Sequence, residues 1–309
     1  MNKTEYIWHN GGLKPWDSCT VHILTHTLHY GSGAFEGIRL YSTDRGPVVF
    51  RLDDHLGRLF YSAGVLGMEI PYSIDQMREA VLQTVSANNL EHGYIRPIVY
   101  YGYGTLGLRP FELPVEVAVA CWPWGAYLGD QMVDIKTSSW ERIAPRTTRT
   151  DAKICGHYVN SILAALEIRG TKYHEALLLD SQGYIAEATA ENVFIVKDGV
   201  ILTPPAGSIL PGITRDTVIR LADTLGIKVE EQQLRREDAL LADEMFLTGT
   251  AAEIHAVRSL DDNVIGTGEQ GRVTGMLKDA FKALVSGKSS SFSEFLTPVG
   301  KDRQLRQVG

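Results

Sequence analysis

Hydrophobic and polar residues alternate along the chain with two different periods, which predict helices and strands. The apolar side chains of residues 73–89 recur at helical spacing and follow a serine in the N-cap position, Ser73. Residues 53–67 show a second stripe at the same spacing. Strands are predicted where valine, isoleucine and aromatic residues are concentrated, at residues 5–10, 36–41, 47–51, 94–101 and 115–122.

The second half of the chain predicts a hairpin, two helices and a strand that ends in a tight turn. The hairpin spans residues 192–205, with the dipeptide Asp198-Gly199 as its two-residue turn. The other three elements are predicted at residues 214–227, 244–254 and 273–287. Because strands and helices mix without strict alternation, the predicted fold class is α+β and not a doubly wound parallel sheet.

A segment without any period, WPWGAYLGDQM, predicts the boundary between two domains. We expect an N-terminal domain at residues 1–121, an interdomain loop at 122–132 and a larger C-terminal domain at 133–309. The aromatic residues of the loop either cover the surface at the junction or line a pocket, since clefts between domains are favoured ligand sites. The tail beyond Gly287 is polar and is expected to be loosely held.

Composition restricts the class of protein. Hydrophobic residues make up 44% and charged residues 22% of the 309 residues, as in soluble globular proteins. The formal net charge of -7 argues against nucleic acid or an anionic membrane as a partner. We find no signal-peptide pattern and no apolar run of about 18 residues, so we expect no membrane span. Three scattered cysteines indicate free thiols in a reducing compartment and no metal site.

Two glycine-containing turns are candidates for binding phosphate, whereas a third motif is not a dinucleotide site. GYGTLG at 102–107 fits the dinucleotide pattern, but Pro110 and Pro114 prevent the helix that such a site needs. LPGITRD at 210–216 predicts a turn before a helix that Thr214 or Asp216 caps, and TGTAAE at 248–253 predicts a second turn. Both are also compatible with ordinary connections.

Candidate acid, base and nucleophile residues are few. Lys153 has small and apolar neighbours in DAKICG, as a catalytic amine requires, although a surface lysine remains an alternative. Glu187 and Glu191 lie among alanine and threonine residues, either half-buried with a partner or in a solvated loop. His26 and His29 are interpreted as structural, because no third metal ligand lies nearby.

Taken together, these segments resemble the branched-chain amino-acid aminotransferases of the bacterial type, which are pyridoxal 5′-phosphate enzymes of fold type IV. The likeness extends from YIWHNG near the start to VSG at 287. It rests on many segments in the family order, including HYGSGAFEGIR, YIRP, WPWGAYLG, AKICGHYVNS, GYIAEATAENVF, LPGITRD and TGTAAE. The resemblance implies a two-domain architecture similar to that of the D-amino-acid aminotransferases.

The resemblance also implies roles for individual residues. Lys153 matches the lysine that binds the cofactor covalently and is the catalytic residue. Tyr158 matches the tyrosine that hydrogen-bonds the phenolic oxygen of the cofactor, and Glu187 matches the carboxylate that faces its pyridine nitrogen. The residues that match the phosphate site are Arg58, Ile213, Thr214 and Thr250.

The substrate site implied by the resemblance combines polar and apolar residues. The α-carboxylate site matches Tyr94 with the N–H groups of Thr250 and Ala251, and Arg96 matches the arginine that meets the side-chain carboxylate of glutamate. The apolar pocket matches Phe35, Trp124 and Tyr127. The residues expected to enter it from a partner subunit are Tyr30, Leu106 and Leu108.

The predicted reaction moves the amino group between L-leucine, L-isoleucine or L-valine and 2-oxoglutarate, yielding branched 2-oxo acids and glutamate in a ping-pong cycle. The protein is predicted to be cytoplasmic and a homo-oligomer, at least a dimer and possibly a hexamer. Arg109, where the sequence departs from the family pattern, is expected to face solvent.

Rival activities on the same fold are D-amino-acid and (R)-amine transamination and the lyase reaction on aminodeoxychorismate. The D-specific enzymes carry an Arg-x-His pair where this chain reads YGYGTLGLRP, which has no histidine. A pyridoxal-phosphate-binding protein without turnover, and a module that binds a phosphate ligand without reacting with it, are further alternatives. Lys153, Tyr158 and Glu187 argue against the first of these two.

Overall fold

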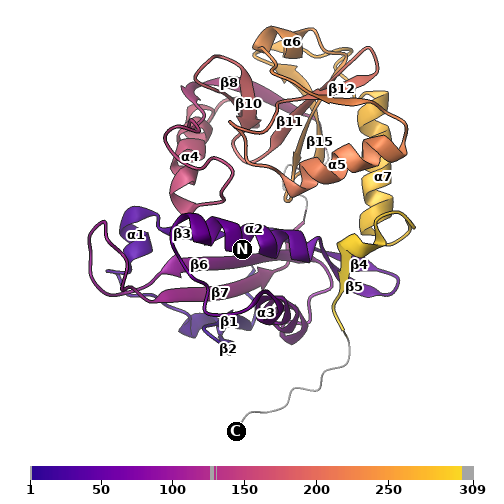
Figure 1. Cartoon of the computed structure of the whole chain (residues 1–309). Coiled ribbons are helices and arrows are strands. Elements are labelled where there is room, and N and C mark those ends of the chain that lie inside the picture. The colour runs from indigo at the N-terminus through magenta and orange to yellow at the C-terminus, as the bar shows by residue number, and fades with distance from the viewer. Residues whose placement is uncertain (1, 126–128, 130, 301–309) are drawn as a thin grey trace. The chain divides into compact units, whose positions relative to one another are not determined.

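The computed structural model describes residues 2–125, 129 and 131–300 and divides the chain into two compact units. The first unit comprises the chain up to Gly125 (indigo to magenta in Figure 1) together with the segment that begins at Leu284, and the second comprises the chain between them. Both units contain helices and strands, in agreement with the predicted α+β class. In the part of the chain that the structure describes, no helix is long and apolar enough to cross a membrane.

The first unit is built on an antiparallel sheet. Its strands follow one another in the order β17-β5-β4-β6-β7-β1-β2, and β3 pairs with β6. Their bounds are β1 Tyr6–His9, β2 Gly12–Pro15, β3 Gly33–Phe35, β4 Ile38–Thr43, β5 Gly46–Phe50, β6 Gly93–Tyr101, β7 Val115–Trp122 and β17 Leu296–Pro298.

Two long helices and the sheet enclose the core of the first unit. These are α2 (Leu52–Val65) and α3 (Ile74–Ala87), and a short helix α1 (His26–Tyr30) and a 3-10 turn at Trp16–Ser18 lie outside this core. The predicted cap of α3 is confirmed, because Ser73 Oγ accepts the N–H of Gln76 and the Gln76 side chain accepts the N–H of Ser73. Such a capping box fixes the start of the helix.

The C-terminal segment differs from the prediction. We expected residues 284–309 to belong to the C-terminal domain and the tail to be loosely held, whereas its described part, up to Gly300, belongs to the first unit. The physical reason is that β17 pairs with β5, with Leu296 opposite Phe50. Phe295 and Val299 are buried on either side of this strand, so the tail contributes to the core.

The second unit contains a mixed sheet that closes on itself. Strand β10 (Ile185–Ala188) pairs on one side with β9 (Glu175–Leu179) and on the other with β11 (Asn192–Lys197). The remaining strands are β8 Val133–Glu141, β12 Val200–Thr203, β13 Val229–Glu231, β14 Glu244–Gly249, β15 Glu253–Leu260 and β16 Asn263–Val264. The turn between β11 and β12 is the predicted one, since Asp198 and Gly199 both have positive φ.

The helices of the second unit cover both faces of this sheet. Residues at alternate positions of a strand point to opposite faces. Leu177 and Leu179 of β9 join the core under α6 (Arg236–Leu240), whereas Ala176 and Leu178 pack against α4 (Tyr158–Glu167). The other helices are α5 Ile213–Thr224 and α7 Arg272–Val285.

Candidate active site

Lys153 lies in the loop between β8 and α4, and its amine contacts the first residue of that helix. Lys153 Nζ lies 2.6 Å from the hydroxyl of Tyr158. The lysine is half-buried, and its neighbours Ala152 and Ile154 are buried, as the small and apolar flanks predict. The contact therefore brings together two of the residues that the resemblance assigns to cofactor binding.

His157 holds the loop that carries Lys153. Its Nδ1 lies 3.2 Å from the carbonyl oxygen of Ala152, and its Nε2 lies 2.7 Å from Thr148 Oγ1. Burial lowers the pKa of His157, the hydrogen bond to Ala152 opposes this shift, and the charge of Arg142 adds to it. A neutral imidazole donates from one nitrogen and accepts at the other, which matches these two contacts.

Glu187 is a buried carboxylate with a buried arginine as its partner. Arg142 Nε donates to Glu187 Oε1 at 2.5 Å, and the Leu210 N–H and the Asn192 amide donate to Oε2 at 3.0 and 3.2 Å. Burial raises the pKa of Glu187, and the charge and hydrogen bond of Arg142, the Leu210 N–H and the charge of Lys153 oppose that increase. The alternative of a solvated loop is wrong for this residue, which is 7% exposed.

Strand register aligns three polar residues in one row. Glu187 on β10 lies opposite Asn192 on β11, and Asn192 lies opposite Thr248 on β14. Val193 and Leu247, one position away, point into the hydrophobic core, so the row lies on the other face of the sheet. The hydroxyl of Thr248 is buried and has no hydrogen-bond partner in the described residues.

The two predicted phosphate turns are both present in this unit. Helix α5 begins at Ile213, and Thr214 is buried in its first turn. The prediction that Thr214 or Asp216 caps the helix is wrong, because the N-cap is Gly212 and no side chain caps it. A side chain could not fit there, since a Cβ atom on Gly212 would lie 2.0 Å from Asn192 Oδ1. Thr250 and Ala251 form the turn between β14 and β15.

Arg58 lies on α2 in the first unit, where it is paired with a buried carboxylate. Its Nε and Nη2 donate to the two oxygens of Glu36 at 2.6 and 2.9 Å, and His55 Nδ1 lies 2.7 Å from the same carboxylate. Burial alone would raise the pKa of Glu36, but the charges and hydrogen bonds of Arg58 and His55 together hold it far below its usual range. The guanidinium of Arg58 is thereby held in a fixed orientation.

The predicted substrate residues of the first unit gather around one tyrosine. The Arg96 guanidinium lies 4.8 Å from the ring centre of Phe35 and 5.5 Å from that of Tyr94. Trp124 meets Tyr94 edge to face, with ring centres 4.5 Å apart. The Arg96 Nε is buried and has no hydrogen-bond partner in the described residues. Arg39 donates to the carbonyl oxygens of Trp124 and Gly125 at 2.9 and 3.1 Å and so fixes this aromatic wall.

The other predicted pocket residues are not part of this cluster. Tyr30, Leu106 and Leu108 are 44%, 47% and 83% exposed on the surface of the first unit. Arg109 faces solvent, as predicted. Tyr127 lies outside the described residues.

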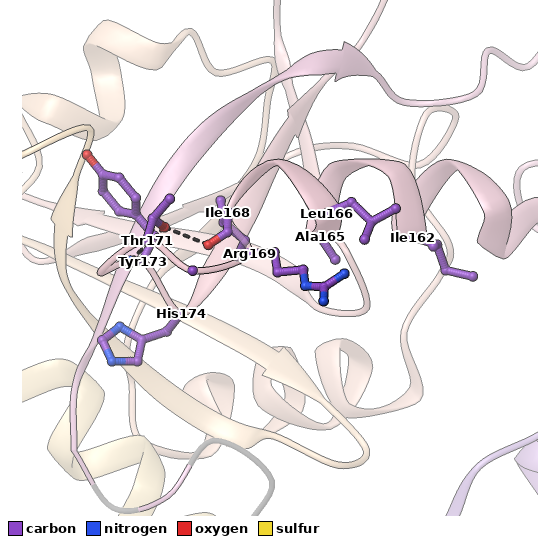
Figure 2. A pocket seen from close by; sticks show the side chains of 9 residues that line it. Ile162, Ala165, Leu166, Ile168, Arg169, Thr171, Tyr173 and His174 are labelled. Carbon is purple, nitrogen blue, oxygen red and sulfur yellow. Dashed lines mark hydrogen bonds between the residues drawn. The ribbon is translucent and has the colours of Figure 1, made fainter.

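A surface pocket lies elsewhere in the second unit. It is shallow and is lined by the C-terminal half of α4 and the segment that follows it, including Leu166, Tyr173 and His174 (Figure 2). None of the predicted site residues lines this pocket. This pocket is therefore not the candidate active site, which consists of the polar row and the turns described above.

Several residues of the site could not be found from the sequence pattern. Arg142, Asn192 and Thr248 hold or adjoin Glu187, Arg39 fixes Trp124, and Glu36 fixes Arg58. For all of these residues except Arg142, the only indication in the sequence was a position inside a motif of the resemblance, as for Asn192 in GYIAEATAENVF. Their contacts depend on strand pairing between distant segments.

Comparisons with known proteins give a consistent result. The family model for amino-transferase class IV matches residues 33–260. The chain is 47% identical to a branched-chain-amino-acid aminotransferase of Pseudomonas aeruginosa over 95% of this chain and 97% of that protein. Its identity to the enzyme of that name from Escherichia coli K12 is 46%, over 93% and 95% of the two chains.

Solved structures agree with this result across the whole fold. The crystal structure of Escherichia coli branched-chain amino acid aminotransferase superimposes with a TM-score of 0.94, at 45% identity, over 96% of this chain and all of the other. The branched-chain amino acid aminotransferase from Thermobaculum terrenum, solved in its pyridoxal-phosphate form, gives a TM-score of 0.91, at 34% identity, over 97% and 100% of the two chains.

Proposed function

Since the chain belongs to the amino-transferase class IV family, we propose that it transfers the amino group between L-leucine, L-isoleucine or L-valine and 2-oxoglutarate in a ping-pong cycle. The observation that carries the proposal is the contact between Lys153 and Tyr158 in the same unit as the Glu187–Arg142 pair. Relatives at 46–47% identity over nearly their full length carry the branched-chain name. They favour this reaction over D-amino-acid or (R)-amine transamination and over the lyase reaction.

The residues of the second unit fit pyridoxal 5′-phosphate. Lys153 supplies the amine, and Tyr158 supplies a hydroxyl for the phenolic oxygen. Glu187 supplies a carboxylate for the pyridine nitrogen. The uncapped start of α5 and the turn at Thr250 supply N–H groups and hydroxyls for a phosphate. The buried hydroxyl of Thr248 has no partner in the described residues, which indicates a site shaped for a ligand.

When bound, the cofactor supplies a ring that stabilises negative charge at the substrate Cα. Lys153 would remove the proton from Cα as a base and then, as an acid, give it up to the cofactor; in the second half-reaction it would deliver a proton to Cα of the new amino acid. The Tyr158 hydroxyl holds Nζ in place between these events. Glu187, which accepts hydrogen bonds from Arg142 and two further donors, would hold a proton on the ring nitrogen of the bound cofactor.

The first unit supplies groups for both kinds of substrate side chain. The apolar surfaces of Phe35 and Trp124 suit the side chain of leucine, and Arg96 suits the side-chain carboxylate of glutamate. The hydroxyl of Tyr94 lies over Gly37, where a Cβ atom would come within 1.7 Å of it. We propose that this hydroxyl and the N–H groups of Thr250 and Ala251 bind the α-carboxylate.

An optical experiment tests the substrate class. The purified protein is expected to show the visible absorption band of bound pyridoxal phosphate, and L-leucine is expected to remove it while 2-oxoglutarate restores it. D-alanine in a parallel cuvette is expected to leave the band unchanged. If D-alanine alone removed the band, the protein would be a D-specific aminotransferase of the same fold. Phe35, Arg96 and Trp124 would then need new assignments.

We further propose that the protein is a homo-oligomer, at least a dimer and possibly a hexamer. The support is an exposed apolar patch on the first unit, made by residues 21–30 and 103–111. The two segments are joined by a bridge between Thr25 and Tyr103 and by the contact of His26 Nε2 with the carbonyl oxygen of Gly107, at 2.7 Å. Its exposed members are Val21, Ile23, Leu24, Leu28, Tyr30, Tyr103, Leu106, Leu108 and Phe111.

A cluster of exposed apolar side chains on two joined segments is typical of a protein–protein interface. A second copy of the chain would bury it and bring Tyr30, Leu106 and Leu108 to the substrate site of its neighbour. The cytoplasm is the proposed compartment, because all three cysteines are free thiols.

The double variant Leu108→Asp/Phe111→Asp is expected to weaken dimerisation by about 30-fold or more, because a buried apolar anchor contributes about 2 kcal/mol at an interface. Sedimentation over a range of protein concentrations measures this shift. Leu241→Asp, at an exposed leucine of the second unit, is the matched control and should leave the association unchanged. An unchanged dimer in the double variant would place the interface elsewhere.

A further inference from the structure

The motif GYGTLG at 102–107, which is not a dinucleotide site, makes up most of a loop between β6 and β7. We call residues 102–108 the substrate loop, because it carries Leu106 and Leu108, two of the residues proposed to reach the site of a neighbouring subunit. Both leucines are exposed, and the described residues of the loop belong to no helix or strand. Three of its seven residues are glycines, so its backbone loses much conformational freedom when it is ordered. The leucines therefore need an anchor that holds them in one place.

One buried histidine, His26, holds both ends of the substrate loop. Its backbone N–H donates to the carbonyl oxygen of Gly102 at 3.1 Å, and its Nε2 lies 2.7 Å from the carbonyl oxygen of Gly107. A carbonyl oxygen only accepts, so Nε2 carries a proton and donates it. The hydrogen bond to Gly107 therefore fixes the backbone between Leu106 and Leu108.

The imidazole of His26 is itself fixed from the side of the sheet. Its Nδ1 lies 2.7 Å from the hydroxyl oxygen of Ser32, and its ring meets the ring of Tyr101 edge to face, with centres 5.9 Å apart. Tyr101 is the last residue of β6 and belongs to the hydrophobic core, and its N–H donates to the carbonyl oxygen of Ser32 at 3.2 Å. The position of the imidazole is thus set by the core of the first unit and not by the loop.

The third residue proposed to enter the neighbouring site also contacts this histidine. The ring centre of Tyr30 lies 4.6 Å from that of the His26 imidazole. Tyr30 is the last residue of α1, and His26 is the first. His26 therefore contacts Tyr30 directly and holds Leu106 and Leu108 through the carbonyl group of Gly107, so one side chain connects all three residues.

We propose that His26 is a positioning residue for the substrate site of the neighbouring subunit, where it holds the substrate loop and Tyr30 in the arrangement that binds an apolar side chain such as that of L-leucine. The inference rests on the proposed function and on the proposed homo-oligomer. The proposed base, Lys153, belongs to the second unit. Loss of His26 should therefore change the KM for L-leucine more than it changes kcat.

Two substitutions separate the hydrogen bond to Gly107 from the rest of the histidine. The amide nitrogen of a glutamine can take the place of Nε2, whereas an asparagine reaches only the place of Nδ1. His26→Asn is expected to raise the KM for L-leucine by about tenfold or more, the factor that one lost apolar contact typically costs in a pocket. His26→Gln is expected to restore most of the wild-type KM, and His92→Asn, at an exposed histidine of the first unit, is the matched control. A wild-type KM in His26→Asn would overturn the proposal.

Hybrid dimers, made by co-expressing two chains with different affinity tags and purifying through both, test whether His26 acts on the neighbouring site. In the first hybrid, one chain carries Lys153→Ala and the other His26→Asn. Its single competent site receives a wild-type loop and should show the wild-type KM. In the second hybrid, one chain carries both substitutions and the other carries neither, so its competent site receives the altered loop and should show the raised KM. The reverse pattern would mean that His26 acts within its own subunit and would overturn the proposal.

Hydrogen exchange gives a readout that needs no turnover. In the holoenzyme without substrate, peptides that cover residues 102–108 are expected to exchange faster in His26→Asn than in the wild type and in His26→Gln. Peptides from α3, in the core of the same unit, should exchange alike in all three proteins. Equal exchange of the loop in His26→Asn and the wild type, or faster exchange throughout the first unit, would contradict a role specific to the loop.

These measurements also separate this inference from the proposed function. If His26→Asn did not fold, Ser32→Ala would replace it, because it removes only the partner of Nδ1. A smaller rise in KM and faster exchange of the loop are expected in that variant, and wild-type values of both would refute the role of His26. If L-leucine did not react with the wild-type protein, the substrate assignment would be wrong, and hydrogen exchange would still decide whether His26 holds the loop.

Discussion

Replacing Lys153 by alanine is expected to abolish transamination, with turnover lower by about 10⁴-fold or more, because one amine acts as cofactor ligand, base and acid. Lys153→Arg is expected to be equally inactive, since a guanidinium stays protonated and cannot accept a proton from Cα. Both variants should fold, because the side chain is half-buried and its amine contacts the hydroxyl of Tyr158 and not the hydrophobic core. Steady-state rates with L-leucine and 2-oxoglutarate measure the loss.

Covalent attachment gives a second readout for Lys153. Borohydride treatment of the wild-type holoenzyme should fix the cofactor to the peptide that contains Lys153, and mass spectrometry should locate it there. Lys228→Ala, at an exposed lysine of the second unit, is the matched control and should keep both activity and attachment. Attachment at another lysine, or turnover within about tenfold of the wild type in Lys153→Ala, would refute the assignment.

Local sequence patterns correctly predicted those features of the fold that depend on residues close together in the sequence. The N-cap at Ser73 and the hairpin turn at Asp198-Gly199 are confirmed because both are set by neighbouring side chains and backbone angles. The predicted cap of α5 was wrong because the start of this helix depends on a residue that is distant in the sequence. Asn192, 20 positions before Gly212 in the sequence, occupies the space where a side chain on the N-cap residue would lie.

Helix α4 was not predicted, although it begins at Tyr158. Its apolar residues Val159, Ile162 and Leu166 fall on one face, but each is more than half exposed, and the buried position is the small Ala164. An amphipathic stripe usually marks the face that packs on the core. Here the sheet contacts the helix through small residues, so the stripe does not indicate the core side.

The candidate site was predictable only as far as motifs could be matched one by one. Lys153 and Tyr158 are five positions apart, and their contact follows from the start of a helix. The row of Glu187, Asn192 and Thr248 instead depends on the pairing of three strands, of which β11 and β14 are about 50 residues apart. A shift of one residue in either register would turn one member of the row towards the core.

Replacing Glu187 by glutamine is expected to reduce turnover by about 10²- to 10³-fold while the cofactor stays bound. Removal of one preorganised polar group beside the reacting atoms typically lowers kcat by about this factor. A neutral amide cannot hold a proton on the pyridine nitrogen as a carboxylate does. Rapid-mixing measurements of the half-reaction with L-leucine, together with the absorption of bound cofactor, separate the loss of turnover from loss of binding.

The structure also predicts a stability effect for this variant. Glu187 accepts three hydrogen bonds, from Arg142, Asn192 and the Leu210 N–H. Glutamine has one acceptor oxygen, so its NH₂ group would face donors, and leaving one of them unsatisfied costs about 1–3 kcal/mol. Thermal unfolding of the holoenzyme should therefore occur at a lower temperature in Glu187→Gln than in Glu237→Gln, which changes an exposed glutamate.

The nitrogen-15 shift of the cofactor ring distinguishes an electrostatic role from a purely structural one. In the wild-type protein the ring nitrogen is expected to be protonated, and in Glu187→Gln it is expected to be neutral at the same pH. Arg142→Lys, which keeps a positive charge near Glu187 but loses the planar guanidinium, should keep the protonated shift and lose mainly stability. A protonated ring nitrogen in Glu187→Gln, together with intact turnover, would mean that Glu187 serves only to anchor Arg142, Asn192 and Leu210.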